Sequence, residues 1–134
     1  MIYFESPFGK CEWDDTTKCV ITTFNGYAEG NNFREPWHKG LELFQLKKAT
    51  KLISDVTTMR VVKLEDQDWA STDWAKRFVA AGAKYLAVVV PTDILGQMAV
   101  QRAASKADQT GLETSYFDNL EAAKTWLSLK RVVL

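Results

Sequence analysis

A chain of 134 residues, 46% of them hydrophobic and 25% charged, can bury one sizeable core and is too apolar to be an intrinsically disordered segment. The 17 Lys and Arg residues balance 17 Asp and Glu residues, so no net field attracts nucleic acid. The sequence therefore predicts one ordered domain over residues 1–134, with no nucleic acid among its partners.

The N-terminal residues predict neither a secretory signal nor a membrane anchor. A short apolar run from Ile2 to Phe4 has no basic residues before it and is followed by Glu5, unlike the start of a signal peptide. Elsewhere, no apolar stretch is long enough to span a bilayer. We therefore expect a cytoplasmic protein without an integral membrane segment.

Two strands joined by a polar turn are predicted first, at residues 10–14 and 18–25, and residues 2–5 could add a third. In period two, Val20, Thr22 and Phe24 alternate with Ile21, Thr23 and Asn25, as on the two faces of a strand. Cys11 and Cys19 flank the turn "EWDDTTK" and could face each other across it. In a reducing cytoplasm, two free half-buried thiols are favoured over a disulfide.

The next stretch, residues 32–48, predicts an amphipathic helix. Asn32 as N-cap with Glu35 three residues later fits a capping box, and Pro36 is tolerated in a first turn. Four large apolar side chains recur at helical spacing and predict one buried stripe: Phe33, Trp37, Leu41 and Phe44.

The second half of the chain predicts alternating strands and helices. The expected elements are a strand at 51–56, a helix at 64–82 ended by Gly82, a strand at 84–91, a helix near 93–107, a strand at 112–117 and a last helix capped by Asp118 with Glu121. The strand "KYLAVVVP" has five consecutive apolar residues, which indicates helices on both faces of a parallel or mixed sheet. The predicted fold class is therefore α/β with about four helices.

This order of elements resembles the STAS domain, specifically its SpoIIAA-like branch, which is also grouped with Sec14-type lipid-binding domains. The resemblance covers about residues 18–128 and is carried by "FNGYAEG", "KLISDV", "EDQDW", "AGAKYLAVVVP" and "YFDNLEAAKTWL". It implies a small sheet with helices on one face, an N-terminal hairpin, and binding or regulation rather than catalysis. The chain lacks the Asp-Ser-x-Gly motif that carries the phosphorylated serine in anti-sigma factor antagonists of this fold.

The stretch Asp55-Val56-Thr57-Thr58 follows an apolar strand, and the carboxyl ends of parallel strands form the edge where open α/β sheets bind ligands. In one interpretation, Asp55 binds a metal ion and handles phosphate together with three nearby acids, namely Glu65, Asp66 and Asp68. In the other, Asp55 accepts loop amides and the threonines stabilise a turn. The second is favoured, because Thr57 stands where a phosphotransferase would carry a second acid.

The chain contains five tryptophans, and large aromatic side chains dominate either cores or interfaces. Trp37 and Trp126 fall on predicted buried stripes. Trp69 and Trp74 lie five apart on one helix and cannot share a face well, so Trp74 is expected to be partly exposed. A lipid-type pocket would need a cavity among Phe33, Trp37, Phe44, Trp69 and Phe78, whereas filled core is the more common outcome.

The leading hypothesis is a non-catalytic binding or regulatory module that binds a protein partner or a small apolar or anionic ligand, with a homodimer as a further possibility. The expected binding residues are Asp55, Thr57, Thr58, Asp66, Trp69 and Trp74. No catalytic residue, metal-ligand set or cofactor is predicted, since the single histidine, His38, has no nucleophile placed beside it. The alternative is a metal-dependent phosphate-handling enzyme that uses Asp55 and the neighbouring acids.

Overall fold

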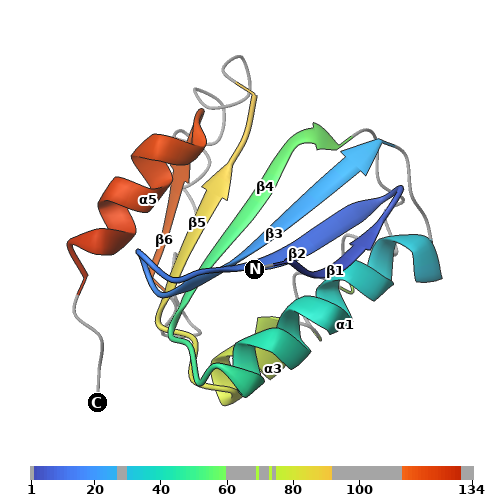
Figure 1. Cartoon of the computed structure of the whole chain (residues 1–134), viewed down its shortest axis with the longest axis horizontal. Helices are drawn as coiled ribbons and strands as arrows, with labels where there is room; N and C mark the ends of the chain where they lie inside the picture. The colour runs from blue at the N-terminus through green and yellow to red at the C-terminus, as the bar shows by residue number, and fades with distance from the viewer. Residues whose placement is uncertain are drawn as a thin grey trace.

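The computed structural model describes residues 2–26, 30–59, 69, 73, 75–91 and 113–130. Within them, six strands form one sheet in the order β1-β2-β3-β4-β5-β6 (Figure 1). The strands are β1 (Ile2–Ser6), β2 (Gly9–Asp14), β3 (Cys19–Gly26), β4 (Lys51–Met59), β5 (Tyr85–Val89) and β6 (Glu113–Phe117); the helices are α1 (Asn31–Leu46), α3 (Ala75–Ala80) and α5 (Leu120–Ser128).

The sheet is mixed, as predicted. The strands β1, β2 and β3 pair antiparallel, and β3 to β6 pair parallel. The optional strand at residues 2–5 is present as β1, whereas the helix predicted near 93–107 lies outside the described residues. Of the helix predicted at 64–82, the structure describes residues 69, 73 and 75–82, which include α3.

Helices cover both faces of the sheet (Figure 1). On one face, Val20 and Leu52 pack in a core with residues of α1 and α3. On the other, their chain neighbours Ile21 and Ile53 pack against α5. The long apolar run at Tyr85–Val89 thus correctly indicated helices on both faces of the sheet. The expectation from the resemblance, that helices lie on one face only, is wrong for this chain. The reason is that the central strands carry apolar side chains on both faces.

Both predicted helix N-caps are displaced. At α1 the N-cap is Gly30 rather than Asn32, because Gly30 adopts φ 58°, which favours glycine, and lets the helix begin earlier. At α5 the N-cap is Asn119 rather than Asp118, because the Asn119 side chain accepts a hydrogen bond from the Ala122 N–H at 2.8 Å.

The helices α1 and α3 end in the same Schellman motif, in which the residue after the C-cap is left-handed. In α3 this residue is Gly82, as predicted, and the Ala83 N–H reaches back to Phe78 O at 3.0 Å. In α1 the equivalent residue is Lys48, with φ 51°, and the Ala49 N–H donates to Phe44 O at 3.0 Å. A left-handed backbone costs a residue with a Cβ about 1 kcal/mol, so α1 ends at a position that would favour glycine.

The two cysteines lie on opposite faces of the sheet. The Cys11 thiol donates to Pro36 O at 3.1 Å beneath α1, whereas Cys19 packs with Ile21 and Ile53 on the α5 face. The expectation that they could face each other is therefore wrong, because successive side chains of a strand point to opposite faces. Both thiols are free, as predicted.

We expect both thiols to be unreactive in the folded protein. Burial raises the pKa of Cys11 to about 12 and that of Cys19 to about 11, so the reactive thiolate is scarce near neutral pH. Ellman's reagent should modify the native protein slowly and should modify both thiols promptly after unfolding in guanidinium chloride. Native thiols that react as fast as free cysteine would contradict this burial.

Candidate functional site

Asp55 lies at the carboxyl end of the parallel pairing between β4 and β5. It is opposite Val89 in the last pair of that ladder, and Pro91 follows shortly afterwards. The two segments therefore end on the same rim of the sheet, as predicted. The strand itself is longer than the predicted 51–56, because β3 extends to Gly26 and pairs with β4 as far as Met59.

A bulge in β4 shapes the turn around Asp55. Thr23 is opposite Asp55 and Asn25 is opposite Thr58, so β4 contains one extra residue between these pairs. Asp55 Oδ1 accepts hydrogen bonds from the Thr57 N–H at 3.1 Å and the Thr57 hydroxyl at 2.6 Å. Asp55 and Thr57 thus meet as the favoured interpretation expected, with the carboxylate satisfying an amide at the bulge.

The acids that the enzyme hypothesis places beside Asp55 are outside the described residues, and so is Trp74; the acids are Glu65, Asp66 and Asp68. In the part of the chain that the structure describes, no group of three His, Cys, Asp or Glu side chains could hold a metal ion. The metal-dependent enzyme therefore stays a prediction.

Trp69 lies against the first turns of α1, on the opposite face of the sheet from Asp55. The Arg34 guanidinium is 4.9 Å from the centroid of the Trp69 ring, and the His38 ring is 5.3 Å from it in an edge-on arrangement. Strand alternation places Asp55 on the face of Ile53 and α5. Asp55 and Trp69 therefore share one end of the sheet but belong to different faces.

Two charged residues extend this group: Asp73 and Arg77 form an ion pair at 3.0 Å, and both lie close enough to His38 to influence its pKa. We call the five side chains the Trp69 cluster: Arg34, His38, Trp69, Asp73 and Arg77. Sequence reasoning singled out Trp69 but missed its neighbours. Arg34 and His38 are four residues apart, which puts both on one face of a helix. This spacing was the signal in the sequence that could have identified them as neighbours in one site.

The aromatic residues proposed to line a lipid-type cavity pack against one another. Phe33 and Trp37 have ring centroids 5.9 Å apart, and Phe44 and Phe78 have centroids 5.0 Å apart. Trp69 is half-buried against the same groups. These contacts are those expected of a filled core.

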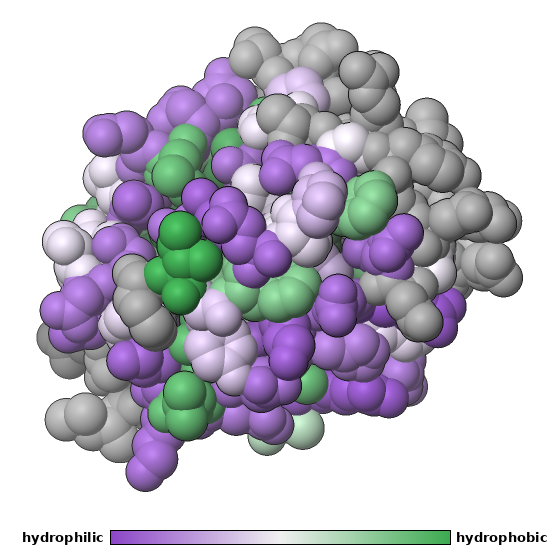
Figure 2. All heavy atoms as spheres, turned by 45° about the vertical axis from the view of Figure 1, so that its right-hand side comes forward, coloured by the Kyte–Doolittle hydropathy of each residue, from purple (hydrophilic) through white to green (hydrophobic). Residues whose placement is uncertain are grey.

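Beside Trp69, the exposed side of α1 forms a shallow hollow of about 340 Å³, lined by Arg34, Glu35, His38, Lys39 and Glu42. Its charges are mixed: Lys39 lies 3.8 Å from Glu42, which also accepts a hydrogen bond from the Tyr3 hydroxyl. On the side of the molecule shown in Figure 2, hydrophobic side chains form small separate groups among hydrophilic ones. Such a surface is typical of a polar interface rather than of a membrane-binding patch.

Protonation of His38 is expected to weaken the fold slightly. Partial burial lowers the pKa of His38 below its usual range, Arg77 and Arg34 lower it further, and Asp73 opposes them. Between the two pKa values, His38 binds more protons in the unfolded chain than in the folded chain. The stabilisation that neutral His38 gives to the fold is therefore complete above about pH 6.5 and is lost as the pH falls toward the lower pKa of the folded state.

Urea titrations between about pH 7 and about pH 5 measure this effect. The loss of stability over that interval should be smaller in His38→Gln than in the wild type. An equal dependence of the unfolding free energy on pH in the two proteins would show that folding does not shift the pKa of His38.

None of the helices in the described part of the chain combines the length and hydrophobicity needed to traverse a bilayer.

No protein-family model matches the sequence, and no curated protein matches it. Among solved structures, the chain is similar to an uncharacterized protein of the DUF3478 family from Shewanella loihica PV-4, described as having a SpoIIAA-like fold. The two share 14% sequence identity and a TM-score of 0.62, over 92% of this chain and 98% of that one. The likeness shows the fold: this chain has the SpoIIAA-like α/β architecture that its sequence predicted.

Proposed function

We propose that this chain, with its SpoIIAA-like fold, is a non-catalytic regulatory module that binds a protein partner at the carboxyl end of its sheet. The observation that carries the proposal is the half-buried Trp69 ring with the Arg34 guanidinium 4.9 Å from its centroid. Tryptophan and arginine are the residues most enriched among those that dominate binding energy at protein interfaces. The mixed charges of the neighbouring hollow favour a polar protein surface over a purely anionic ligand.

The turn at Asp55 is included in the proposed surface because it lies at the same end of the sheet as Trp69. A protein interface of standard size covers about 800 Å² on each partner, and this area is wide enough to include both faces at one end of a small sheet. The proposed contact residues are therefore those that the sequence singled out together with two from α1: Arg34, His38, Asp55, Thr57, Thr58, Asp66, Trp69 and Trp74.

Paired charge-removing variants test this surface. Arg34→Gln removes a cation at the Trp69 ring, and Lys76→Gln removes an exposed cation on α3 as its control. Quantitative affinity capture should find a protein that the wild type and Lys76→Gln both retain and that Arg34→Gln loses. For that protein, Arg34→Gln should weaken binding by about 30-fold, the size expected for a dominant interface arginine.

Equal retention by the two variants would contradict the proposed surface. A captured partner that proves to be a second copy of this chain would make the surface a homodimer contact. Thermal stabilisation by magnesium that disappears in Asp55→Asn would instead support the metal-dependent enzyme.

A further inference from the structure

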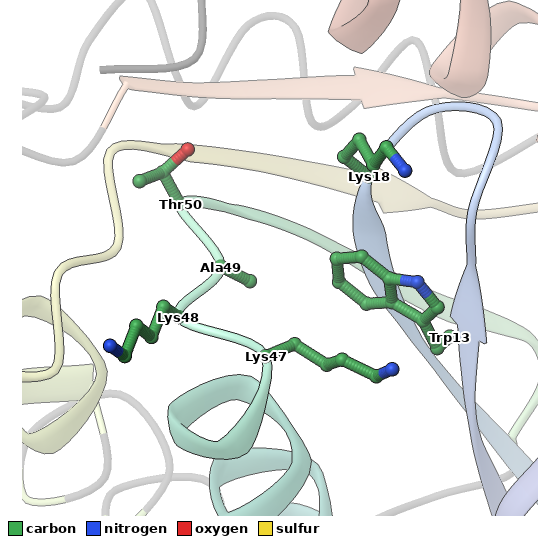
Figure 3. A pocket seen from close by; sticks show the side chains of 6 residues that line it. All are labelled: Trp13, Lys18, Lys47, Lys48, Ala49 and Thr50. Atoms are coloured by element: carbon green, nitrogen blue, oxygen red, sulfur yellow. The ribbon is translucent and has the colours of Figure 1, made fainter. Parts of the chain in front are cut away.

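A second hollow lies at the opposite end of the sheet from the Trp69 cluster, between the β2–β3 turn, the end of α1 and the start of β4 (Figure 3). Its volume is about 270 Å³. We call it the lysine pocket, and it is lined by Trp13, Lys18, Lys47, Lys48, Ala49 and Thr50. It shares no residue with the proposed partner surface.

The lysine pocket carries an excess of positive charge. Three lysines line it, and the carboxylate paired with one of them is Asp15, 2.7 Å from Lys18 Nζ. This ion pair is exposed on both sides, so an anion entering the pocket can compete with Asp15 for Lys18. Lys47 Nζ lies 5.4 Å from the centroid of the Trp13 ring.

Two of the three lysines occupy backbone positions that favour glycine. Lys18, with φ 55°, and Lys48, with φ 51°, are the only non-glycine residues with positive φ in the described part of the chain. They lie 30 residues apart in sequence, yet both line one pocket. Since α3 ends in the same motif with Gly82, backbone geometry does not account for a lysine at position 48. Strained residues that converge on one hollow point to a function there.

A simpler explanation covers only part of this arrangement. Cations near the C-terminus of a helix are favoured by the helix dipole, and Lys47 and Lys48 follow the last turn of α1. That effect does not explain Lys18, which the β2–β3 turn brings to the pocket, nor the left-handed backbone of Lys48.

We propose that the lysine pocket binds a small ligand that carries a phosphate group. Ammonium groups act as compact point charges that bind phosphate oxygens, and the lining residues include no acidic side chain that would repel an anion. A phosphate group carries a charge of about −1.5 to −2 on one centre at neutral pH, so three lysines favour it over a singly charged carboxylate. Figure 3 shows Lys18 and Lys47 on either side of Trp13 and Lys48 on the opposite wall with its ammonium turned outward. Rotation of an exposed side chain takes picoseconds to nanoseconds, so Lys48 can turn toward a bound anion.

Pyrophosphate is a suitable probe, followed by amide chemical shifts at constant ionic strength. The shifts should saturate and should be largest at Lys18, Lys48 and Ala49, with citrate binding more weakly. The double variant Lys47→Gln/Lys48→Gln should weaken pyrophosphate binding by about tenfold or more. The control Lys10→Gln/Lys76→Gln removes the same charge outside the pocket and should bind as the wild type does.

Lys48→Gly separates binding from folding. It gives α1 the residue that ends α3, so it should raise the melting temperature while weakening pyrophosphate binding. Equal weakening in the two double variants, citrate binding as tight as pyrophosphate, or shifts that do not saturate would each overturn the proposal.

The source of the phosphate is distinguished with phosphatidylcholine vesicles that contain phosphatidic acid. Co-sedimentation that Lys47→Gln/Lys48→Gln abolishes would identify a lipid headgroup. Binding of pyrophosphate without co-sedimentation would identify a soluble phosphate compound. Both results support the pocket, and neither depends on the Arg34 experiment at the other end of the sheet.

Discussion

Replacement of Phe44 by alanine is expected to lower the free energy of unfolding by about 4 kcal/mol. The Phe44 side chain is 0% exposed and packs on Phe78, with ring centroids 5.0 Å apart. Its loss removes the ring contact between α1 and α3 and leaves a cavity that the neighbouring strands cannot fill. Denaturant unfolding followed by far-ultraviolet circular dichroism measures the change.

A matched control lies two residues further along α1. Leu46 is 67% exposed, so Leu46→Ala should change the free energy of unfolding by less than about 0.5 kcal/mol. If Phe44→Ala leaves too little folded protein, Phe44→Leu should show a smaller loss in the same direction. Similar losses for Phe44→Ala and Leu46→Ala would contradict the packing of α1 described above.

Replacement of Gly9 by alanine is expected to cost about 3 kcal/mol, because the first residue of β2 touches α1 directly. A Cβ at position 9 would lie 2.7 Å from Pro36 Cγ and 2.9 Å from Thr23 O. Neither atom can move easily, since Pro36 is part of α1 and the Thr23 carbonyl belongs to β3. The methyl group would therefore push the helix away from the sheet, which thermal and urea unfolding would report.

Gly40 provides the comparison at the same contact between helix and sheet. A Cβ there would lie 3.3 Å from Thr22 Oγ1, a tight contact with a side-chain atom. Because alanine in a helix interior is favoured over glycine by about 1 kcal/mol, the net effect of Gly40→Ala should be within about 1 kcal/mol of zero. A Gly9→Ala variant no less stable than Gly40→Ala would show that β2 and α1 are further apart than described.

The strands were the most predictable part of this fold. Alternating side chains in β3 and the apolar run in β5 record which faces of a strand are buried, and this information is local. The ends of the helices were less predictable. Asn32 and Asp118 each lie within two residues of another good capping residue, Gly30 and Asn119, so local preference alone cannot choose between them.

The candidate sites were predictable only where topology determined them. The position of Asp55 on the carboxyl rim follows from parallel pairing, which the sequence indicated. The contact of Trp69 with Arg34 joins segments 35 residues apart, and no local pattern encodes it. The sequence did not single out Lys18 or Lys48, although the absence of glycine after the predicted helix was a detectable signal at Lys48.

The order of strands across the sheet is the order of strands along the chain. Each strand leaving the ribosome therefore finds the edge it needs already present in the strand made just before it, starting from the hairpin of β1 and β2. Growth by addition to a finished edge means that each strand pairs with its neighbour in sequence across a connection of 25 residues or fewer, which limits the entropy lost on closing each connection. The nascent chain can thus acquire its architecture progressively during synthesis, without holding an early strand open for a late partner.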